Sequence, residues 1–400
     1  MATFKPATPP KSIDINKFLG LNESIGETEI KLGESVKQEN CRITNNYKVE
    51  KRPGHTAFID FSNSLECTGL WYGVLDGNEI MIAINNGNIY EYDMTVDTDT
   101  TAIADLITEG TVILVGTITA SATEIFFFES KLYFINGTDY KEYDGTTYQD
   151  VVAYIPVVAE NAPPAGGGTD GEDINLLTDQ KRMTFVGDGS STVYQLRDVP
   201  VTSIDIVKKN GVTLTLGVDY TASAVNGQVT FTIAPLTTDV IEVTWTLTGA
   251  GNADLVKNNR FSIRFGPGNN TNVFMWGNDN FINKIIWSGV LNAGYFPANN
   301  FNFIGTDDFA VTDLNPQYDR LLIFKEDRTY YSYAEFNSTL DIYVYPVFDL
   351  NKAVGCSAYN ASQVVENNPI SLKGKSVWRW TNTQVDDERN AAIDRDWETL

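Results

Sequence analysis

Few residues in this chain have side chains that could carry out chemistry. His55 is the only histidine among 400 residues, so a Ser-His-Asp or Cys-His mechanism would have to use it. His55 follows a Pro-Gly turn, which favours a surface position at a strand edge. Cys41, Cys67 and Cys356 are far apart and form no C-x-x-C pair, which argues against a zinc site and a disulfide framework. We expect no catalytic histidine, no metal and no cofactor.

Paired carboxylates are the remaining catalytic option, because glycoside hydrolases need only two of them. The acidic candidates are Asp307-Asp308, Asp341 and Asp386-Asp387, and no flanking pattern sets any of them at a defined distance from a partner. The S-x-D-x-G-x-x-W box that sialidases repeat is absent. The sequence therefore predicts a protein that is not an enzyme, and a hydrolase is the weakest of three hypotheses.

The elements that would position any site are hairpins, and one hairpin pattern occurs about five times. The clearest copy runs from Lys131 to Asp144: an apolar run, an Asn-Gly-Thr-Asp corner, and a return strand carrying Tyr140 and Tyr143. A tight Gly- or Asx-rich corner between two such runs is the strongest short-range hairpin signal. Other copies start near residues 80, 321 and 370, and a looser one, Val273–Phe281, starts near 273. The regular aromatic residues favour packing between sheets over stacking on sugars or bases.

The spacing of the hairpins predicts the fold. Three of the four gaps between them are 52, 48 and 49 residues long. The fourth gap is 141 residues and falls to roughly 56 when residues 166–250 are treated as an insertion. About 50 residues is the length of one four-stranded propeller blade. We therefore predict an all-β chain, a β-propeller with about five visible blades and an inserted small β-sandwich domain.

The predicted organisation has four segments. Residues 1–60 form an N-terminal arm with the first strands, 61–165 and 251–400 the two parts of the propeller, and 166–250 the insertion. Pro163–Gly168 is the expected linker. Residues 385–400 are highly charged and hold no further strand pair, so the last blade lacks outer strands. Either Tyr47–Lys51 completes that blade or the natural chain is longer, and we favour the longer chain.

The charge of the chain is uneven. The net charge is −23, but residues 1–60 carry nine Lys/Arg against eight Asp/Glu, so the excess of acid lies in the body. An acidic body does not wrap nucleic acid by neutralising phosphates. It could line a passage that DNA crosses without adhering, although a surface charge for solubility explains the same count. No run approaches the length of a membrane helix, and the first residues are too polar for a signal peptide.

Several short motifs resemble a known family. The chain opens with Phe18-Leu19-Gly20-Leu21-Asn22, continues with a Glu-to-Asn step (Glu34 or Ser35 to Asn40), and closes a strand with Lys51-Arg52-Pro53-Gly54. Together with the late segment Val385–Ala391 and the repeated hairpins, this order resembles the β-propeller nozzle or tail-hub proteins of short-tailed bacteriophages. The phrases F-x-G-D-G-S and V-x-K-N-G-V in the insertion resemble a module of phage tail and fibre proteins.

The resemblance implies a structural virion protein, assembled in the host cytoplasm, with no membrane anchor. It would form a homo-oligomeric ring, hexameric by analogy, that contacts portal, adaptor and distal tail proteins and lets DNA pass. It implies structural or interface roles for Lys51, Arg52, Pro53, Gly54, Asp386, Asp387, Glu388, Arg389 and Asn390. The alternative is a receptor- or glycan-binding tail protein that uses the inserted 166–250 domain.

Overall fold

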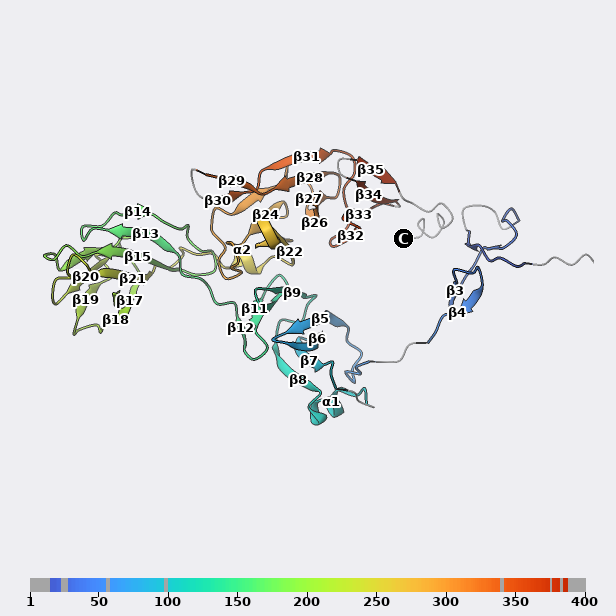
Figure 1. The fold of residues 1–400 in the computed structure, drawn as a ribbon, viewed down its shortest axis with the longest axis horizontal. Coiled ribbons are helices and arrows are strands. Elements are labelled where there is room, and N and C mark those ends of the chain that lie inside the picture. Colours follow the sequence, from blue (N-terminus) through green and yellow to red (C-terminus); the bar gives the residue numbers. More distant parts are fainter. Residues whose placement is uncertain are drawn as a thin grey trace, which may run out of the picture.

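The structure, a computed structural model, describes residues 15–22, 28–54, 58–96, 100–338, 342–374, 376–381 and 384–387. The chain is nearly all β (Figure 1). Three short helices lie within the described ranges: α1 (Ile103–Glu109), α2 (Asp254–Lys257) and α3 (Pro267–Asn270). Five of the residues considered above lie outside the described residues: His55, Asp341, Glu388, Arg389 and Asn390.

The described chain contains five four-stranded antiparallel sheets, and four of them contain a hairpin as predicted. We number them in chain order. The first sheet contains β5 (Cys67–Leu75), β6 (Asn78–Asn85), β7 (Asn88–Asp93) and β8 (Val112–Thr117). The second contains β9 (Glu124–Phe128), β10 (Lys131–Ile135), β11 (Tyr140–Tyr143) and β12 (Tyr148–Asp150). The hairpins predicted to start near residue 80 and at Lys131 are confirmed as β6 with β7 and β10 with β11.

The last three sheets follow a second, unrelated group of strands. The third sheet contains β22 (Phe261–Phe265), β23 (Asn272–Trp276), β24 (Lys284–Trp287) and β25 (Phe301–Phe303). The fourth contains β26 (Val311–Gln317), β27 (Arg320–Lys325), β28 (Thr329–Tyr333) and β31 (Val347–Asn351), and a small hairpin, β29 (Glu335–Asn337) with β30 (Ile342–Val344), projects from it. The fifth contains β32 (Ser362–Val365), β33 (Asn368–Lys373), β34 (Ser376–Thr381) and β35 (Gln384–Asp387).

The five sheets succeed one another along an arc through their first strands. The strand β5 contacts β9, β9 contacts β22, β22 contacts β26, and β26 contacts β32. Each consecutive pair of sheets also shares a cluster of buried apolar side chains. Figure 1 shows the same succession from β5, in blue, to β35, in red, with one side of the arc open. The second and third sheets are therefore neighbours although 110 residues separate β12 from β22.

The turn residues explain why the hairpins are tight. The β5–β6 turn consists of Asp76 and Gly77, with φ of 48° and 81°, and the β6–β7 turn of Asn86 and Gly87, with φ of 51° and 76°. Two consecutive positive φ angles define the turn whose twist matches that of paired strands, and Asp-Gly and Asn-Gly adopt it at least cost. The Asp-Gly and Asn-Gly pairs that predict hairpins in the sequence are thus the residues that adopt the observed turn conformation.

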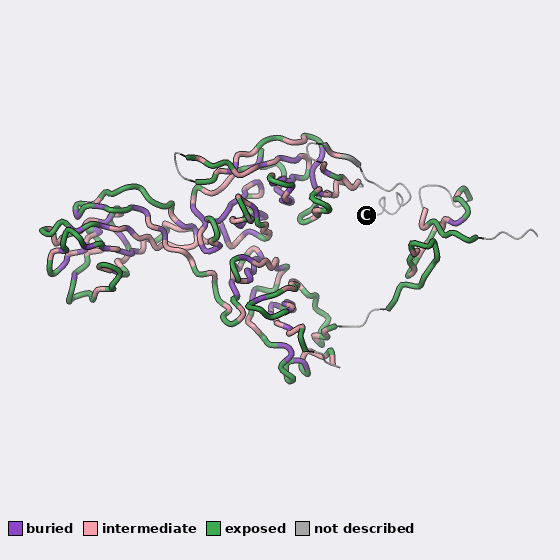
Figure 2. The backbone as a smooth tube through the Cα atoms, viewed as in Figure 1, coloured by how far each residue is buried: buried purple, intermediate pink, exposed green. Residues whose placement is uncertain are grey.

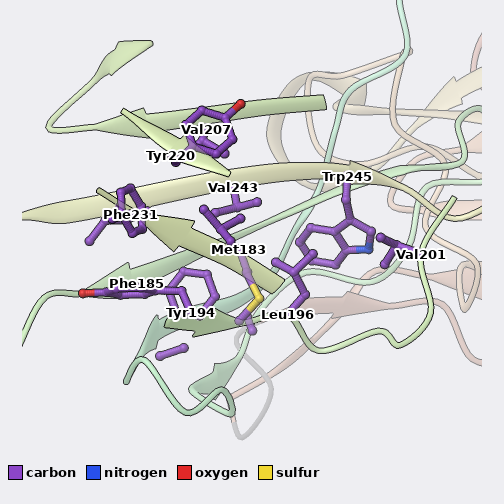
Figure 3. Packing of buried hydrophobic residues seen from close by; sticks show 14 of the residues in the cluster. Met183, Phe185, Tyr194, Leu196, Val201, Val207, Tyr220, Phe231, Val243 and Trp245 are labelled. Carbon is purple, nitrogen blue, oxygen red and sulfur yellow. The ribbon is translucent and has the colours of Figure 1, made fainter. Parts of the chain in front are cut away.

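Residues between the second and third sheets form two further sheets. A six-stranded sheet has the order β14-β13-β15-β21-β17-β18 and a three-stranded sheet the order β16-β20-β19. Their strands are β13 (Val157–Ala162), β14 (Thr169–Asp170), β15 (Gln180–Val186), β16 (Val193–Gln195), β17 (Ser203–Lys209), β18 (Val212–Thr213), β19 (Tyr220–Ser223), β20 (Gln228–Phe231) and β21 (Val240–Thr246). Figure 3 shows the core between them, where Phe185 and Phe231 pack against Tyr194, and Trp245 lies beside Leu196 and Val201.

Three local predictions are wrong. Pro163–Gly168 is not a linker, because it joins β13 to β14 of one sheet, and the amide of Gln195 donates to the carbonyl of Pro164 at 2.9 Å. The looser hairpin copy has a longer loop, since β23 pairs with a strand that begins at Lys284, beyond Phe281. The last sheet has its fourth strand, because β35 pairs with β34. The segment Tyr47–Lys51 is therefore not needed to complete that sheet.

The N-terminal arm, residues 15–54 without 23–27, makes its own small pairings. The strands β1 (Gly20–Leu21) and β2 (Glu34–Ser35) are parallel, and β3 (Cys41–Ile43) pairs with β4 (Val49–Lys51) in an antiparallel ladder. Backbone hydrogen bonds join distant residues of the arm to one another, as from the Phe18 amide to the Tyr47 carbonyl at 3.0 Å and from the Leu19 amide to the Gly33 carbonyl at 2.7 Å. Figure 2 shows it away from the sheets and largely exposed.

Candidate functional site

Two carboxylates, on the first strands of the second and fourth sheets, form hydrogen bonds to the next sheet of the arc. Glu124 begins β9 of the second sheet, and one of its carboxylate oxygens accepts two hydrogen bonds from Ser262 of β22. The Ser262 amide donates at 2.9 Å and its hydroxyl at 2.6 Å. One side chain thus connects the first strands of two sheets whose residues are 138 positions apart.

Asp313 repeats this arrangement between the fourth and fifth sheets. Its Oδ2 accepts from the amide of Ser362 at 2.8 Å and from the Ser362 hydroxyl at 2.7 Å. Its Oδ1 accepts from the amide of Leu314 at 2.8 Å. Glu124, Ser262, Asp313 and Ser362 each lie at the start of, or one or two residues into, the first strand of their sheet. We call these four residues the acid–serine row.

Both carboxyl groups of the row hold their protons more tightly than usual. Burial raises the pKa of Glu124 to about 7, against the lowering effect of the Ser262 hydrogen bonds, and the negative charge of Asp313 raises it further. Burial also raises the pKa of Asp313 to about 6, although Ser362 and the Leu314 amide lower it. In both cases desolvation of the charged form exceeds the stabilisation that the hydrogen bonds provide.

A carboxyl group with a pKa near neutrality can act as a general acid, but only when a substrate can reach it. One oxygen of each carboxylate, Glu124 Oε1 and Asp313 Oδ2, already accepts from a serine hydroxyl and a backbone amide. These hydrogen bonds give the acid–serine row the geometry of a connection between neighbouring sheets.

The structure places the sequence-predicted interface residues at the two ends of the described chain, without joining them to one site. Lys51 ends β4 and is exposed, as are Arg52, Pro53 and Gly54. The amide of Arg52 donates to the carbonyl of Asn40 at 2.8 Å. Asp386 and Asp387 lie in β35, where they pair with Arg379 and Trp378 of β34.

The other candidates that the sequence raised do not form a site. Asp307 and Asp308 are exposed in the loop after β25, and Asp308 accepts from the Thr306 hydroxyl at 3.0 Å. The three cysteines are free thiols. Within the described ranges, no group of three or more His, Cys, Asp or Glu side chains could hold a metal ion. Among these same residues, no helix is long and apolar enough to cross a bilayer.

A second candidate site lies where the β14–β15 connection meets the third sheet. It is a cleft of about 690 Å³, within the range of roughly 300–1,000 Å³ typical of ligand sites. The lining comes from the 171–173 segment, the end of β24, the loop between β24 and β25, and β30. A smaller cleft of about 450 Å³ shares Gly171, Glu172, Asp173 and Asn299 with it and also contains Lys181 and Arg197. We call the larger one the junction cleft.

Hydrogen bonds fix one wall of the junction cleft. The Glu172 carboxylate accepts from the Tyr154 hydroxyl and from the Val157 amide, both at 2.8 Å. The Tyr295 hydroxyl donates to the carbonyl of Asp173 at 2.9 Å. The rings of Tyr154 and Tyr295 are 5.1 Å apart. Burial and the charges of Glu172 and Asp173 raise the pKa of Tyr295, so its hydroxyl stays protonated and remains a donor.

Sequence reasoning missed both sites for a physical reason. Each one joins side chains that are far apart in the chain, and only the arrangement of the sheets brings them together. A signal existed for the acid–serine row, because each member lies near the start of the run that forms the first strand of a repeat. No comparable signal marks the junction cleft, whose lining comes from four unrelated connections.

Comparisons with known proteins give only distant similarities. No protein-family model and no curated protein match the sequence. A 6-phosphogluconolactonase candidate from Bacteroides uniformis is 10% identical, with a TM-score of 0.31 over 80% of this chain and 84% of that one. A Lactobacillus plantarum protein is 9% identical, with a TM-score of 0.29 over 89% and 93%. The extracellular domain of a candidate one-component system from B. thetaiotaomicron is 9% identical, with a TM-score of 0.30; the match covers 82% of this chain and about a third (34%) of that chain.

Proposed function

We propose that this protein is a non-enzymatic structural subunit of a tailed-bacteriophage virion, a tail nozzle or hub protein built as a β-propeller. In this proposal the five four-stranded sheets are blades, and residues 166–250 belong to a small β-sandwich between the second and third blades. The unbroken succession of contacts between first strands supports it, because inner strands contact one another in this way around a propeller axis. The motifs that resemble the nozzle proteins supply the virion assignment.

One observation carries the assembly part of the proposal: the apolar face of β5 is uncovered. Leu70, Tyr72 and Val74 are 65%, 58% and 59% exposed. They alternate with Trp71, which packs into the cluster shared with the second sheet, so they point to the opposite face. An exposed apolar patch of this kind marks an interaction surface. We assign it to a neighbouring copy in a head-to-tail ring, which needs two different surfaces on each subunit.

The N-terminal arm supplies a second apolar surface. Leu19, Leu32, Tyr47 and Val49 are exposed large hydrophobic residues on this arm. An arm with such residues and internal backbone hydrogen bonds suits a contact with a neighbouring subunit or with the portal and adaptor. Lys51, Arg52, Pro53 and Gly54 would belong to that contact.

The charge of the body fits the proposed passage of DNA. With 20 Lys/Arg against 44 Asp/Glu in residues 61–400, duplex DNA gains no counterion release on contact and can pass without adhering. The proposed assembly is a hexameric ring located in the tail of the virion. No cofactor and no reaction are needed for this role.

A mass measurement in solution tests the proposal. The full chain, alone or with purified portal complexes, is expected to give a closed homo-oligomer or a stoichiometric addition to the portal ring. The double variant Tyr72→Lys, Val74→Lys places two charges on the uncovered face of β5 and is expected to shift the population to monomers. The matched control Val218→Lys, Val225→Lys changes two exposed valines of the insertion and should assemble normally. A wild-type chain that stays monomeric in both settings would contradict the proposal.

A second candidate function is recognition of a receptor or glycan with the inserted segment. The junction cleft favours it, because the 171–173 segment of the insertion forms one wall, and the third sheet with its β24–β25 loop and the β29–β30 hairpin supply the rest. This function is compatible with a structural role in a tail.

A further inference from the structure

The junction cleft combines an apolar floor with polar groups that have no partner. Tyr295 and Tyr343 contribute aromatic surface, Val290 and Ile342 add exposed aliphatic surface, and the buried Trp287 lies beneath them. Trp287 is held from behind by Phe274, with ring centroids 5.6 Å apart. The hydroxyl and backbone contacts of Tyr295 and Glu172 described above keep one wall rigid. A preformed concave site of this kind binds small molecules with little loss of conformational entropy.

Three polar side chains of the lining are unused. The Asp173 carboxylate and the amides of Asn299 and Asn300 make no hydrogen bond to any of the residues that the structure describes, although all three line the cleft. The Asn272 amide, by contrast, is fully engaged: it donates to the Ser288 carbonyl at 2.7 Å and accepts from the Tyr345 hydroxyl at 2.8 Å. The polar side chains of the lining that remain open to a ligand are therefore those of Asp173, Asn299 and Asn300.

The chemistry of these groups selects the ligand class. An asparagine amide has two donors and an acceptor, and a carboxylate accepts, so together they match neighbouring hydroxyl groups, each of which donates and accepts. Flat aromatic surfaces suit the apolar faces of sugar rings. The lining contains no Lys or Arg but includes Glu172 and Asp173, so an anionic ligand would meet like charge. A simple cation would leave the amide donors of Asn299 and Asn300 without acceptors.

We propose that the junction cleft binds an uncharged oligosaccharide, with Tyr343 against a sugar face and Asp173, Asn299 and Asn300 hydrogen-bonded to sugar hydroxyls. The inference rests on the second candidate function, recognition of a glycan, and not on ring assembly. It locates the binding site at the border of the insertion with the third sheet and the β29–β30 hairpin. The insertion by itself therefore lacks most of the site.

Calorimetric titration of the full chain tests the inference. The probes are glucose oligomers, N-acetylglucosamine oligomers and mannose oligomers as neutral ligands, an oligogalacturonate as the anion, and trilysine as the cation. At least one neutral series is expected to bind, with affinity rising with chain length, and the two charged probes are expected not to bind in the same range. Failure of all neutral oligomers to bind, or preference for a charged probe, would overturn the inference.

Two pairs of variants locate the site. Tyr343→Asn and Asp173→Ala are expected to weaken binding of the neutral oligomer at least tenfold. Tyr318→Asn and Asp76→Asn remove an exposed tyrosine and an exposed aspartate from hairpin turns outside the cleft, at positive φ angles that Asn tolerates, and should leave affinity unchanged. The same cleft variants should keep the oligomeric state of the wild type, which separates failure of this inference from failure of the ring proposal. Equal affinity in all four variants would place the sugar elsewhere and overturn the inference.

Discussion

At the scale of single residues, the acid–serine row is held together by groups that are costly to ionise. The row connects the first strands of neighbouring sheets by hydrogen bonds. Burial of its two carboxyl groups raises their pKa values toward neutrality. A protonated carboxyl can still accept from a serine hydroxyl and amide, so the connection between sheets survives protonation. The free energy of the fold should therefore depend on pH through these two groups.

Replacing Glu124 with glutamine should remove part of this dependence. The folded chain binds a proton at Glu124 more tightly than the unfolded chain does, since its pKa rises from an ordinary 4.5 to about 7. The wild type therefore loses stability as pH rises from about 4.5 to 7, by up to about 3 kcal/mol. Glu124→Gln keeps an acceptor for Ser262 and cannot ionise, so it should unfold at a higher temperature than the wild type at pH 8 and at a similar one at pH 4.5.

Melting temperatures measured across this pH range check the prediction. Glu66→Gln, a change at an exposed residue, serves as the control and should follow the wild-type curve. A lower melting temperature for Glu124→Gln at pH 8 would mean that the ionised carboxylate is the better partner for Ser262, contrary to the direction of the pKa shift.

Sequence reasoning located none of the residues of the acid–serine row, and the reason is general. It ranked Asp307, Asp341 and Asp386 by their neighbours in the chain, whereas Glu124 and Ser262 meet only after the second and third sheets have packed together. Burial, which raises the pKa values, is likewise a property of the packed sheets. The sequence does contain the positions of the repeats. When the repeats are aligned with one another, an acid or a serine is found near the start of the first strand in four of them.

At the scale of elements, the hairpins were predictable because their signals are local. Asn86-Gly87 and Asp76-Gly77 specify a turn with two positive φ angles, and the apolar runs on either side specify the strands. The strand β35 was missed because Gln384–Asp387 contains two aspartates, which have low strand propensity, and pairing with β34 overrides that preference. The segment Pro163–Gly168 has the composition of a linker but forms the turn between β13 and β14. Its composition does not reveal this role, because the pairing of β13 with β14 and β15 depends on residues outside the segment.

The two turns of the first sheet offer a matched test of their geometry. Gly77→Ala and Gly87→Ala both place a side chain at positive φ, which costs about 1–2 kcal/mol. A Cβ at position 77 would meet open space, whereas one at 87 would lie 2.5 Å from the carbonyl oxygen of Ile118. We expect Gly87→Ala to lower the free energy of unfolding by about 2 kcal/mol more than Gly77→Ala does. Urea unfolding midpoints measure the difference, and equal midpoints would show that the Ile118 carbonyl moves aside freely.

At the scale of the whole molecule, the repeat spacing indicated several similar units, and the structure shows how they are joined. Five four-stranded sheets follow one another through their first strands, and the group of strands between the second and third sheets leaves that succession unbroken. The sequence could not show that one end of the arc exposes Leu70, Tyr72 and Val74, because apolar alternation in a strand looks the same whether a neighbour covers it or not.

The charge and the uncovered face together predict how assembly responds to salt. Copies with a net charge of −23 repel one another, and the repulsion is screened as the Debye length falls from about 30 Å at 0.01 M to about 8 Å at 0.15 M. The contact that we assign to β5 is apolar, so added salt does not weaken it. The oligomeric fraction should therefore rise as sodium chloride increases from 10 to 300 mM, and single-particle mass measurements at each concentration give that fraction. A fraction that falls with salt would instead show that ion pairs hold the copies together, which would move the subunit contact away from β5 and toward the Lys51–Gly54 stretch of the arm.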